Sequence, residues 1–238
     1  MSDGTEGGGD ALGGSGGDCE AAGSTDDGAD GEPDVNTLIM EATYRALRTH
    51  GYADLSVSHI AEEFEKSKSL LYYHYDSKDD LLAGFLSFAG AHFIEMLEAA
   101  EREAADPLER IRALVDIYLG AELDEEMTEA QRAMIDLRAQ AVAEPRFREE
   151  FTRIDRHLRE RLADAVADGV EAGVIDERAD PEAAGAWLLA TLTGAMLQRH
   201  TAEFDVVTPV RSMLHGRIDE FAATDGPAAT DGSSPDGG

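Results

Sequence analysis

Apolar residues recur every three or four positions through most of the chain, which is the spacing of one face of an α-helix. Val35, Leu38, Ile39, Ala42 and Ala46 share such a face, and this predicts a helix that stops at Gly51. Two short helices are expected next, the first capped by Ser56 and the second by Ser67. Runs of β-branched residues with period two, which would indicate strands, are absent from the sequence.

Side chains that favour helix starts continue the same pattern downstream. Ser77 followed by Asp80 resembles a capping box for a long helix that runs to about residue 104. Pro145 is expected to open another helix. A capping residue also precedes a proline in three places, which are Asp106-Pro107, Asp180-Pro181 and Thr208-Pro209. The sequence therefore predicts an all-α protein of about nine helices, with three short ones followed by a larger helical body.

The expected domain organisation follows from shifts in composition. Residues 1–33 are rich in Gly, Asp and Glu and have no apolar period, which predicts a disordered acidic arm. Residues 223–238 have the same character and are expected to be a disordered tail. Between them we expect two helical units, over 34–80 and 81–222, because long helices replace short ones near residue 80.

The charge balance is unusual: 50 acidic residues stand against 20 basic ones, for a net charge of −30. Dispersed carboxylates keep a protein hydrated at high salt, where their mutual repulsion is screened, so we expect a halophilic, cytoplasmic protein. The single cysteine, Cys19, suits a reducing compartment, and no secretory signal is apparent. The longest uncharged stretch, residues 183–197, is shorter than the ~20 residues that span a bilayer, which indicates a helix buried on most sides rather than a membrane protein.

All three lysines of this acidic chain lie within "EKSKSLLYYHYDSKDD", residues 65–80. Lys68 would follow the Ser67 cap, and Lys78 would follow the Ser77 cap. A helix N-terminus is partly positive, so lysine is unfavourable there unless an anion binds. Two lysines at adjacent helix starts, beside exposed backbone N–H groups, therefore predict a phosphate-binding edge, although lysines also occur simply as solvated surface groups.

The order of these short helices is that of a helix-turn-helix, and the sequence from Asp34 to Leu82 resembles, without a gap, the DNA-binding domain of TetR-family transcriptional regulators. Gly51-Tyr52, Ser56-Val57, Ile60-Ala61 and Ser67-Lys68 match the pattern of that domain, as do the aromatic run Leu71–Tyr75 and Ser77-Lys78 with Leu81. The resemblance implies that Ser58, Ser69, Leu70 and Tyr73 face base edges. It also implies that Lys68, Tyr72, His74 and Lys78 contact the phosphate backbone, beside Lys66 and Ser67. Leu71 and Tyr75 are expected to pack inside, and Tyr72 is open between packing and DNA contact.

Two features depart from the family pattern. Glu65 and Lys66 stand in the turn where the family usually has glycine and a small apolar residue, so the turn is expected to be reshaped, with Lys66 pointing outward. Residues 34–82 also contain nine acidic and five basic residues. Generic reasoning from net charge would reject this domain as a DNA binder, whereas the focusing of the bases at one edge supports it.

The resemblance further implies that residues 34–80 are a DNA-binding domain and residues 81–222 an effector-binding and dimerisation domain. It also implies a homodimer formed by helices 181–200 and 209–222. Such a dimer would place two recognition helices about one DNA turn apart on a palindromic double-stranded operator. Candidate residues for an unknown small-molecule effector are the larger apolar ones of the body, any of which could instead be plain core: Tyr118, Met134, Phe147, Trp187 and Met196.

The sequence gives less support to other classes of function. No nucleophile stands beside a base, no glycine-rich phosphate loop precedes a helix, and the carboxylates form no metal-ligand pattern, so we expect neither an enzyme nor a cofactor or metal site. The alternative is a ligand- or protein-interaction module of the same fold that has lost operator binding. The acidic arm either competes with DNA for the lysine edge or only solvates the protein.

Overall fold

The computed structural model describes residues 34–120 and 122–223, and residues from Asp34 onward form one compact unit. The described residues fold into nine helices and no strand, which confirms the predicted all-α class. The expected acidic arm (1–33) and nearly all of the expected tail (224–238) lie outside the described residues. The helices are α1 (Val35–Asp54), α2 (Val57–Glu63), α3 (Lys68–His74), α4 (Lys78–Glu103), α5 (Pro107–Leu119), α6 (Glu125–Gln140), α7 (Pro145–Glu171), α8 (Pro181–Thr201) and α9 (Val207–Ala223).

Four of the nine described helix starts are fixed by capping side chains that the sequence predicted. The Ser56 and Ser77 hydroxyls accept hydrogen bonds from His59 N and Asp80 N at 3.2 and 3.0 Å. Asp106 and Asp180 likewise accept from backbone N–H groups at the starts of α5 and α8. A side-chain cap satisfies one of the N–H groups that a helix start leaves without an intrahelical partner, so these four starts are determined locally.

Two predicted caps are wrong. Ser67 stands at the N-cap position of α3, but its side chain accepts no capping hydrogen bond. Thr208 does not cap α9, because that helix begins at Val207 and Asp205 Oδ1 accepts from Thr208 N at 3.1 Å. Asp205, three residues upstream, thus provides the side-chain cap at the start of α9 that Thr208 was expected to provide.

The first helix is interrupted where the sequence predicted its end. Gly51 has φ 66° and ψ 167°, a left-handed value of φ that side chains with a Cβ rarely adopt. Leu55 N then donates to Gly51 O at 3.1 Å, which closes the turn toward α2. The glycine therefore sets the angle between α1 and the helix-turn-helix.

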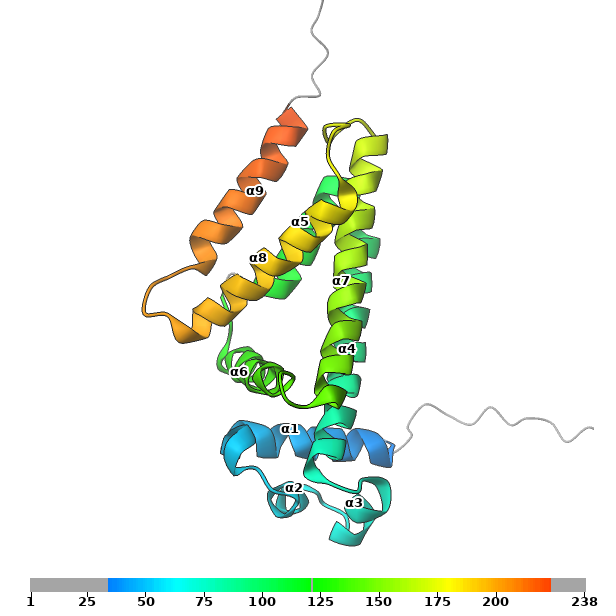
Figure 1. Cartoon of the computed structure of the whole chain (residues 1–238), viewed down its shortest axis with the longest axis vertical. Helices are drawn as coiled ribbons and strands as arrows, with labels where there is room; N and C mark the ends of the chain where they lie inside the picture. Colours follow the sequence, from blue (N-terminus) through cyan, green and yellow to red (C-terminus); the bar gives the residue numbers. More distant parts are fainter. Residues whose placement is uncertain (1–33, 121, 224–238) are drawn as a thin grey trace, which may run out of the picture. The chain divides into compact units, whose positions relative to one another are not determined.

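Two clusters of buried side chains hold the unit together, and α4 and α7 run through both. The first packs α1–α3 against the start of α4, the end of α6 and the start of α7, around Ile39, Leu71 and Phe147. The second packs the rest of α4 and α7 with α5, α8 and α9, around Leu97, Leu114 and Leu162. Figure 1 shows α4 and α7 side by side, with α1, α2 and α3 grouped at one end of them.

Helix α4 is long and apolar enough, by length and composition alone, to cross a membrane. Its apolar residues have another explanation here, since Leu81, Leu82, Phe85 and Leu86 belong to the first cluster and Leu97 to the second. The composition of α4 thus follows from its place between two cores.

Helix α8 was expected to be buried on most sides, and this is wrong. Only one face packs inward, with Leu188, Leu192 and Met196 buried, while Trp187 and Leu197 on the other face are exposed. The inward face lies close to α7, because a Cβ at Gly185 would come within 2.7 Å of Arg159 O. The apolar composition of α8 thus comes from two faces, of which the single chain covers one.

Candidate nucleic-acid interface and ligand cavity

The helix-turn-helix is positioned by a few buried residues that all point toward α1. Ile60 of α2, Phe64 in the turn and Leu71 of α3 are buried in the first cluster. The Tyr75 hydroxyl donates to Asn36 Oδ1 at 2.8 Å, which ties the end of α3 to α1. With this face fixed inward, the opposite face of α3 is presented to solvent.

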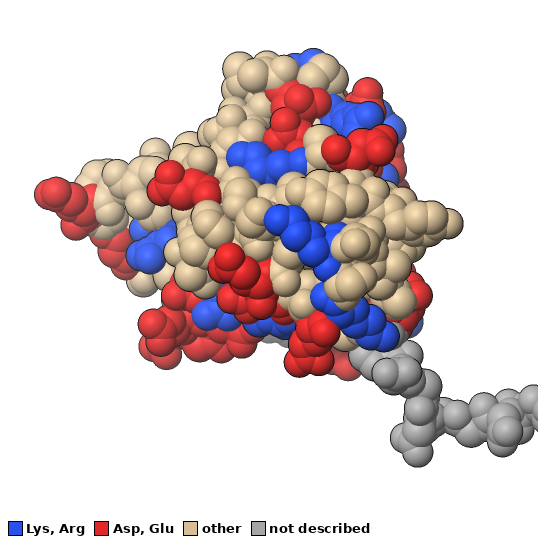
Figure 2. All heavy atoms as spheres, turned by 90° about the horizontal axis from the view of Figure 1, so that it is seen from below, with Lys and Arg blue, Asp and Glu red and all other residues tan. Residues whose placement is uncertain are grey.

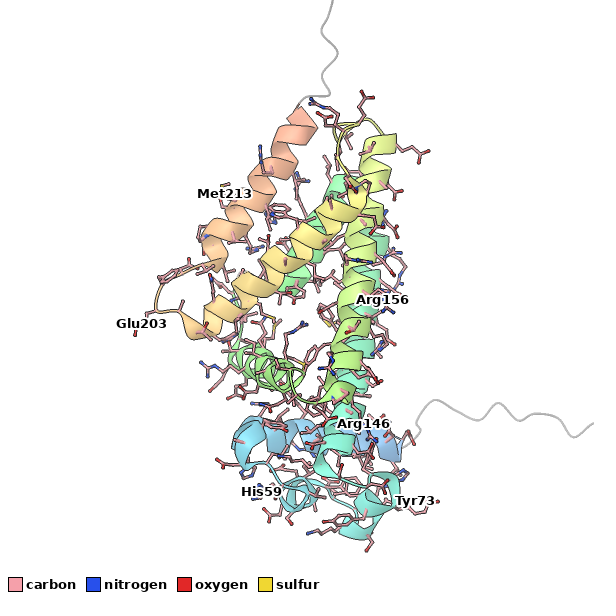
Figure 3. All side chains as sticks on the ribbon, viewed as in Figure 1. His59, Tyr73, Arg146, Arg156, Glu203 and Met213 are labelled. Carbon is pink, nitrogen blue, oxygen red and sulfur yellow. The ribbon has the colours of Figure 1, made fainter. Side chains whose placement is uncertain are left out.

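That outward face carries the predicted recognition residues. Ser69 and His74 are exposed, Leu70 is half-buried, and Tyr73 is 83 % exposed with its ring perpendicular to that of His74. Figure 3 shows Tyr73 pointing away from the body at the end that carries α2 and α3. An aromatic ring held out in solvent on a rigid helix is available to a partner in a way that a buried ring is not.

Lys68 connects the two helices of the motif. Its Nζ donates to Ser58 Oγ at 2.8 Å and lies 5.9 Å from the centre of the Tyr72 ring. Tyr72 is 53 % exposed, so its ring does not fill the core. Lys66 and Ser67 are exposed in the turn beside them.

Lys78 is half-buried and already has local partners. Its Nζ donates to Tyr52 O at 3.2 Å and lies 4.3 Å from the centre of the Tyr52 ring. The side chain therefore ties the start of α4 to the end of α1. An ammonium has three donors, so a phosphate contact stays a prediction for this residue.

Figure 2 views the end of the unit that carries α2 and α3. It shows basic side chains as separate patches on a surface that is otherwise largely uncharged, with acidic side chains around them. The arrangement agrees with a net acidic domain whose positive charge is local.

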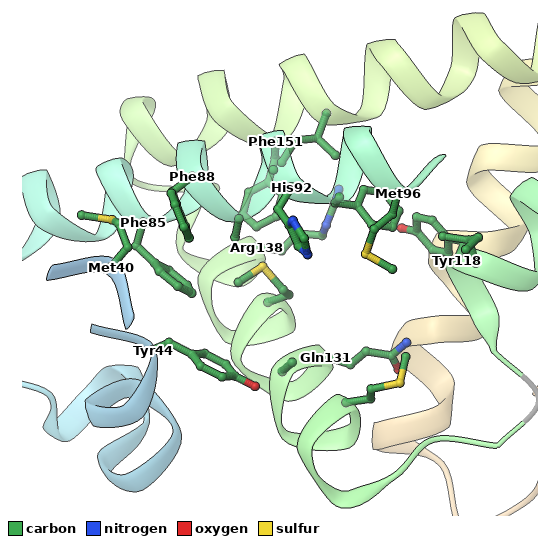
Figure 4. Close-up of a pocket in the computed structure, with 18 of the residues that line it drawn as sticks. Met40, Tyr44, Phe85, Phe88, His92, Met96, Tyr118, Gln131, Arg138 and Phe151 are labelled. Atoms are coloured by element: carbon green, nitrogen blue, oxygen red, sulfur yellow. The ribbon is translucent and has the colours of Figure 1, made fainter. Parts of the chain in front are cut away.

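A cavity of about 420 Å³ lies between α1, α4, α5, α6, α7 and α8 (Figure 4). Its walls hold five of the seven methionines in the sequence and six aromatic side chains. These are Met40, Met96, Met127, Met134 and Met196, with Tyr44, Phe85, Phe88, Phe93, Tyr118 and Phe151. Methionine is flexible and polarizable, so such walls adapt to apolar ligands of different shape.

The predicted effector residues separate into two groups. Tyr118, Met134 and Met196 line this cavity. Phe147 does not, because it is fully buried in the first cluster, edge-on to Tyr52 with ring centres 6.3 Å apart. Trp187 lies on the solvent-facing side of α8 and is 58 % exposed.

The polar groups of Arg138 and Tyr118 in the cavity walls already have partners. Arg138 Nη1 and Nη2 donate to the two carboxylate oxygens of Asp155, both at 2.8 Å, and the guanidinium lies over the Phe151 ring. The Tyr118 hydroxyl is 3.0 Å from Thr193 Oγ1, and burial raises the pKa of this phenol, so it stays protonated at neutral pH. The cavity therefore has an apolar character even where its residues carry polar atoms.

The side of the cavity formed by α6 is linked to α8. Gln131 Oε1 lies 3.0 Å from His200 Nε2 and 3.3 Å from Arg199 Nη1. Burial, together with Arg132 and Arg199, lowers the pKa of His200, which keeps this imidazole neutral at physiological pH. The neutral ring can donate to the amide oxygen without adding charge to the cavity wall.

Within the described ranges, no group of three or more His, Cys, Asp or Glu side chains is placed to hold a metal ion. The exposed face of α3 is suited to recognition of a surface, and the cavity of the body is suited to enclosure of an apolar molecule.

Comparisons with known proteins agree with this arrangement. Residues 39–84 match the family described as bacterial regulatory proteins, tetR family, and residues 107–221 match the BetI-type transcriptional repressor, C-terminal family. The chain is 32 % identical to a TetR transcription regulator from Haloarcula marismortui of known structure, over 80 % of this chain and 97 % of that one, with a TM-score of 0.68.

Two more distant proteins are also similar to the chain. A putative TetR-family regulator from Rhodococcus sp. is 24 % identical over 79 % of this chain and 98 % of its own, with a TM-score of 0.67. The HTH-type transcriptional repressor AcnR of Corynebacterium efficiens is 26 % identical over 57 % of this chain and 69 % of its own length. On the helix-turn-helix, the helical body and these matches together, the chain belongs to the TetR family of DNA-binding transcriptional regulators.

Proposed function

We propose that this protein is a ligand-responsive, homodimeric repressor that binds a palindromic operator in a halophilic cytoplasm. The observation that carries the DNA-binding part is the outward face of α3, held rigid by Leu71 and Ile60 and presenting the exposed Tyr73. The strongly acidic composition suits molar salt, where counterion release contributes little and base contacts must supply more of the affinity.

The roles proposed for the individual side chains are those that the resemblance to TetR-family regulators implies. Ser58, Ser69, Leu70 and Tyr73 would face base edges in the major groove. Lys66, Ser67, Lys68, Tyr72, His74 and Lys78 would contact phosphates, and Lys78 would do so while keeping its bond to Tyr52.

The dimer would form through the face that α8 and α9 leave open. Trp187 and Leu197 of α8, Met213 of α9 and Phe204 between them are all exposed large apolar side chains in the single chain (Figure 3 labels Met213). Large apolar patches on a soluble monomer mark interaction surfaces, and a second copy of the same face would cover them symmetrically.

The effector would occupy the cavity of about 420 Å³. Its walls belong to α1 of the DNA-binding region as well as to the body, through Met40 and Tyr44. A ligand there touches the elements that set the position of the helix-turn-helix.

A footprint of the purified protein on the DNA upstream of its own gene, at molar KCl, tests the operator proposal. Protection of a palindromic site is the expected result. Absence of protection at every salt concentration would instead support a module of this fold that has lost operator binding.

Replacing Tyr73 with alanine is expected to weaken operator binding by about 1–3 kcal/mol and to relax sequence preference, as loss of a base contact does.

Lys68→Ala is expected to weaken binding to all DNA sequences alike, because it removes a phosphate contact. Fluorescence anisotropy with operator and scrambled DNA measures both effects. Val142→Ala, at an equally exposed apolar side chain on the α6–α7 turn, should change neither.

A further inference from the structure

The cavity changes in character from its buried end to its mouth. Phe85, Tyr118, Phe151 and Met196 are buried, and none of them brings a charge. The remaining wall includes exposed residues of three helices, Glu41 of α1, Phe88, His92 and Met96 of α4, and Met127 of α6. An apolar part of a ligand therefore fits inside, and a polar head group fits only at the mouth.

The charge of the one basic residue in the lining is already balanced. Arg138 is the only lysine or arginine among the lining residues, and both of its terminal nitrogens bind Asp155. The guanidinium keeps further N–H donors, but a ligand carboxylate would be a second anion beside a pair whose charges already cancel, so the lining offers it no net positive charge.

The mouth carries negative charge instead. Glu41 lines the cavity, is exposed, and forms no salt bridge within the described part of the chain. His92, another exposed lining residue, lies 3.9 Å from Glu95. The two arginines that follow Glu41 on α1 are already paired, Arg45 with Glu63 of α2 and Arg48 with Glu129 and Glu126 of α6.

The remaining walls favour a cation as well. Figure 4 shows Phe85 and Phe88 of α4 at the same end of the cavity as Tyr44 of α1, with His92 and Met96 farther along α4. The Arg48 guanidinium already lies 5.4 Å from the centre of the Tyr44 ring, so Phe85 and Phe88 are the rings left to a ligand at this end. The face of an aromatic ring attracts a positively charged group, and this attraction survives high salt better where the group is partly desolvated.

We propose that the effector is an amphiphile with a positively charged head group, whose apolar part fills the cavity and whose head lies at the mouth beside Glu41. The inference rests on the proposed effector function of the cavity. It assigns Glu41 as the residue that determines which ligand charge is preferred. The absence of an unpaired basic side chain from the lining contributes to the same preference.

Three probes with the same ten-carbon chain test the proposal: decyltrimethylammonium, decanoate and decanol, each below its critical micelle concentration. Isothermal titration of the full-length dimer in KCl should show one site per chain. The cation is expected to bind about 10-fold more tightly than decanoate, in keeping with a partly desolvated contact to aromatic rings.

The variant Glu41→Gln should lower the affinity for decyltrimethylammonium by about 3-fold, the value of a partly exposed ion pair, and leave decanol unchanged. Glu103→Gln removes one negative charge from an exposed position at the end of α4 that does not line the cavity, and it should change none of the three affinities. Equal binding of all three probes, or an equal effect of the two variants, would overturn the preference for a cation.

Ala130→Phe on α6 places a ring in the cavity wall and should weaken binding of every probe while the melting temperature stays near that of the parent protein. If no probe binds the parent protein, or if Ala130→Phe changes nothing, the proposed effector site itself is wrong. Binding that is sensitive to Ala130→Phe but indifferent to head-group charge overturns only the ligand class.

Discussion

Replacing Trp187 with glutamate is expected to dissociate the protein into monomers and to abolish high-affinity binding to a palindromic operator. Trp187 is 58 % exposed in the single chain and lies on the open face of α8 with Leu197. Large aromatic residues at the centre of an interface contribute about 2–4 kcal/mol each, which corresponds to a change of roughly 30- to 1,000-fold in the dissociation constant of the dimer. Glutamate would lose that contribution and place two like charges near the twofold axis.

Loss of the dimer should lower the affinity for the operator because each chain carries only one α3. A dimer binds two half-sites with one association step, whereas a monomer binds one half-site and gains nothing from the second. Analytical ultracentrifugation gives the assembly state, and anisotropy on full and half operators gives the affinity. The half-site affinity should be unchanged.

The matched control is Val142→Glu. Val142 is 84 % exposed, is apolar and lies on the turn between α6 and α7, away from α8 and α9. This variant should stay dimeric and bind the full operator normally. A Trp187→Glu protein that remains dimeric would show that the exposed face of α8 is not the interface.

The helices could be predicted from the sequence because their starts depend on local chemistry. Ser56 and Ser77 cap the helices that follow them through a backbone N–H three residues away, a contact that needs no tertiary structure. Prediction was wrong where two local signals compete, as at Thr208, where Asp205 starts α9 earlier. At Ser67 the residue type was right for a cap, but its hydroxyl makes no such bond.

The cavity could be predicted only in part, because its walls come from six helices. The methionines at positions 40, 96, 127, 134 and 196 are far apart in sequence, and only the fold brings them together. Apolar character alone does not show whether a residue fills a core, lines a cavity or belongs to an exposed interaction surface. Phe147 and Trp187 look alike in sequence, yet one is fully buried and the other lies in solvent.

Helix α6 connects the cavity to the two regions that a bound ligand is expected to affect, the DNA-binding region and α8. Arg48 Nε of α1 donates to Glu129 Oε2 at 2.6 Å, and Gln131 of the cavity wall lies 3.0 Å from His200 of α8. Only Ala133 and Leu137 of α6 are buried, so little apolar packing holds this helix in place. Any displacement of α6 by a ligand therefore changes its contacts to the DNA-binding region and to α8, the helix of the proposed dimer interface, together.

The body is held more firmly around a buried carboxylate, and Glu101→Gln is expected to lower the free energy of unfolding by about 3 kcal/mol, as breaking a buried ion pair does. The Glu101 side chain is 3 % exposed and accepts from Arg110 Nη2 at 3.1 Å and from Arg161 Nε at 2.7 Å. These contacts join α4, α5 and α7. Glutamine keeps the shape but removes the charge, which leaves two arginines close together without the anion between them.

Arg110 also binds Asp168, and Arg161 lies 3.8 Å from Asp164, so the remaining partners limit the loss. Chemical unfolding followed by circular dichroism measures it, with Glu103→Gln as the control. Glu103 is exposed two residues along the same helix, and its substitution should change stability by less than about 0.5 kcal/mol.

Salt provides the decisive test of burial for Glu101. Attraction between exposed charges is screened within about 10 Å at 0.1 M salt and within about 3 Å at 1 M, whereas a buried pair is screened much less. The difference between the parent protein and Glu101→Gln should therefore persist from 0.5 to 3 M KCl, concentrations at which any effect of breaking the exposed Arg45–Glu63 pair should disappear. A difference that vanishes with added KCl would mean that solvent reaches Glu101 and that the three helices are held by apolar packing alone.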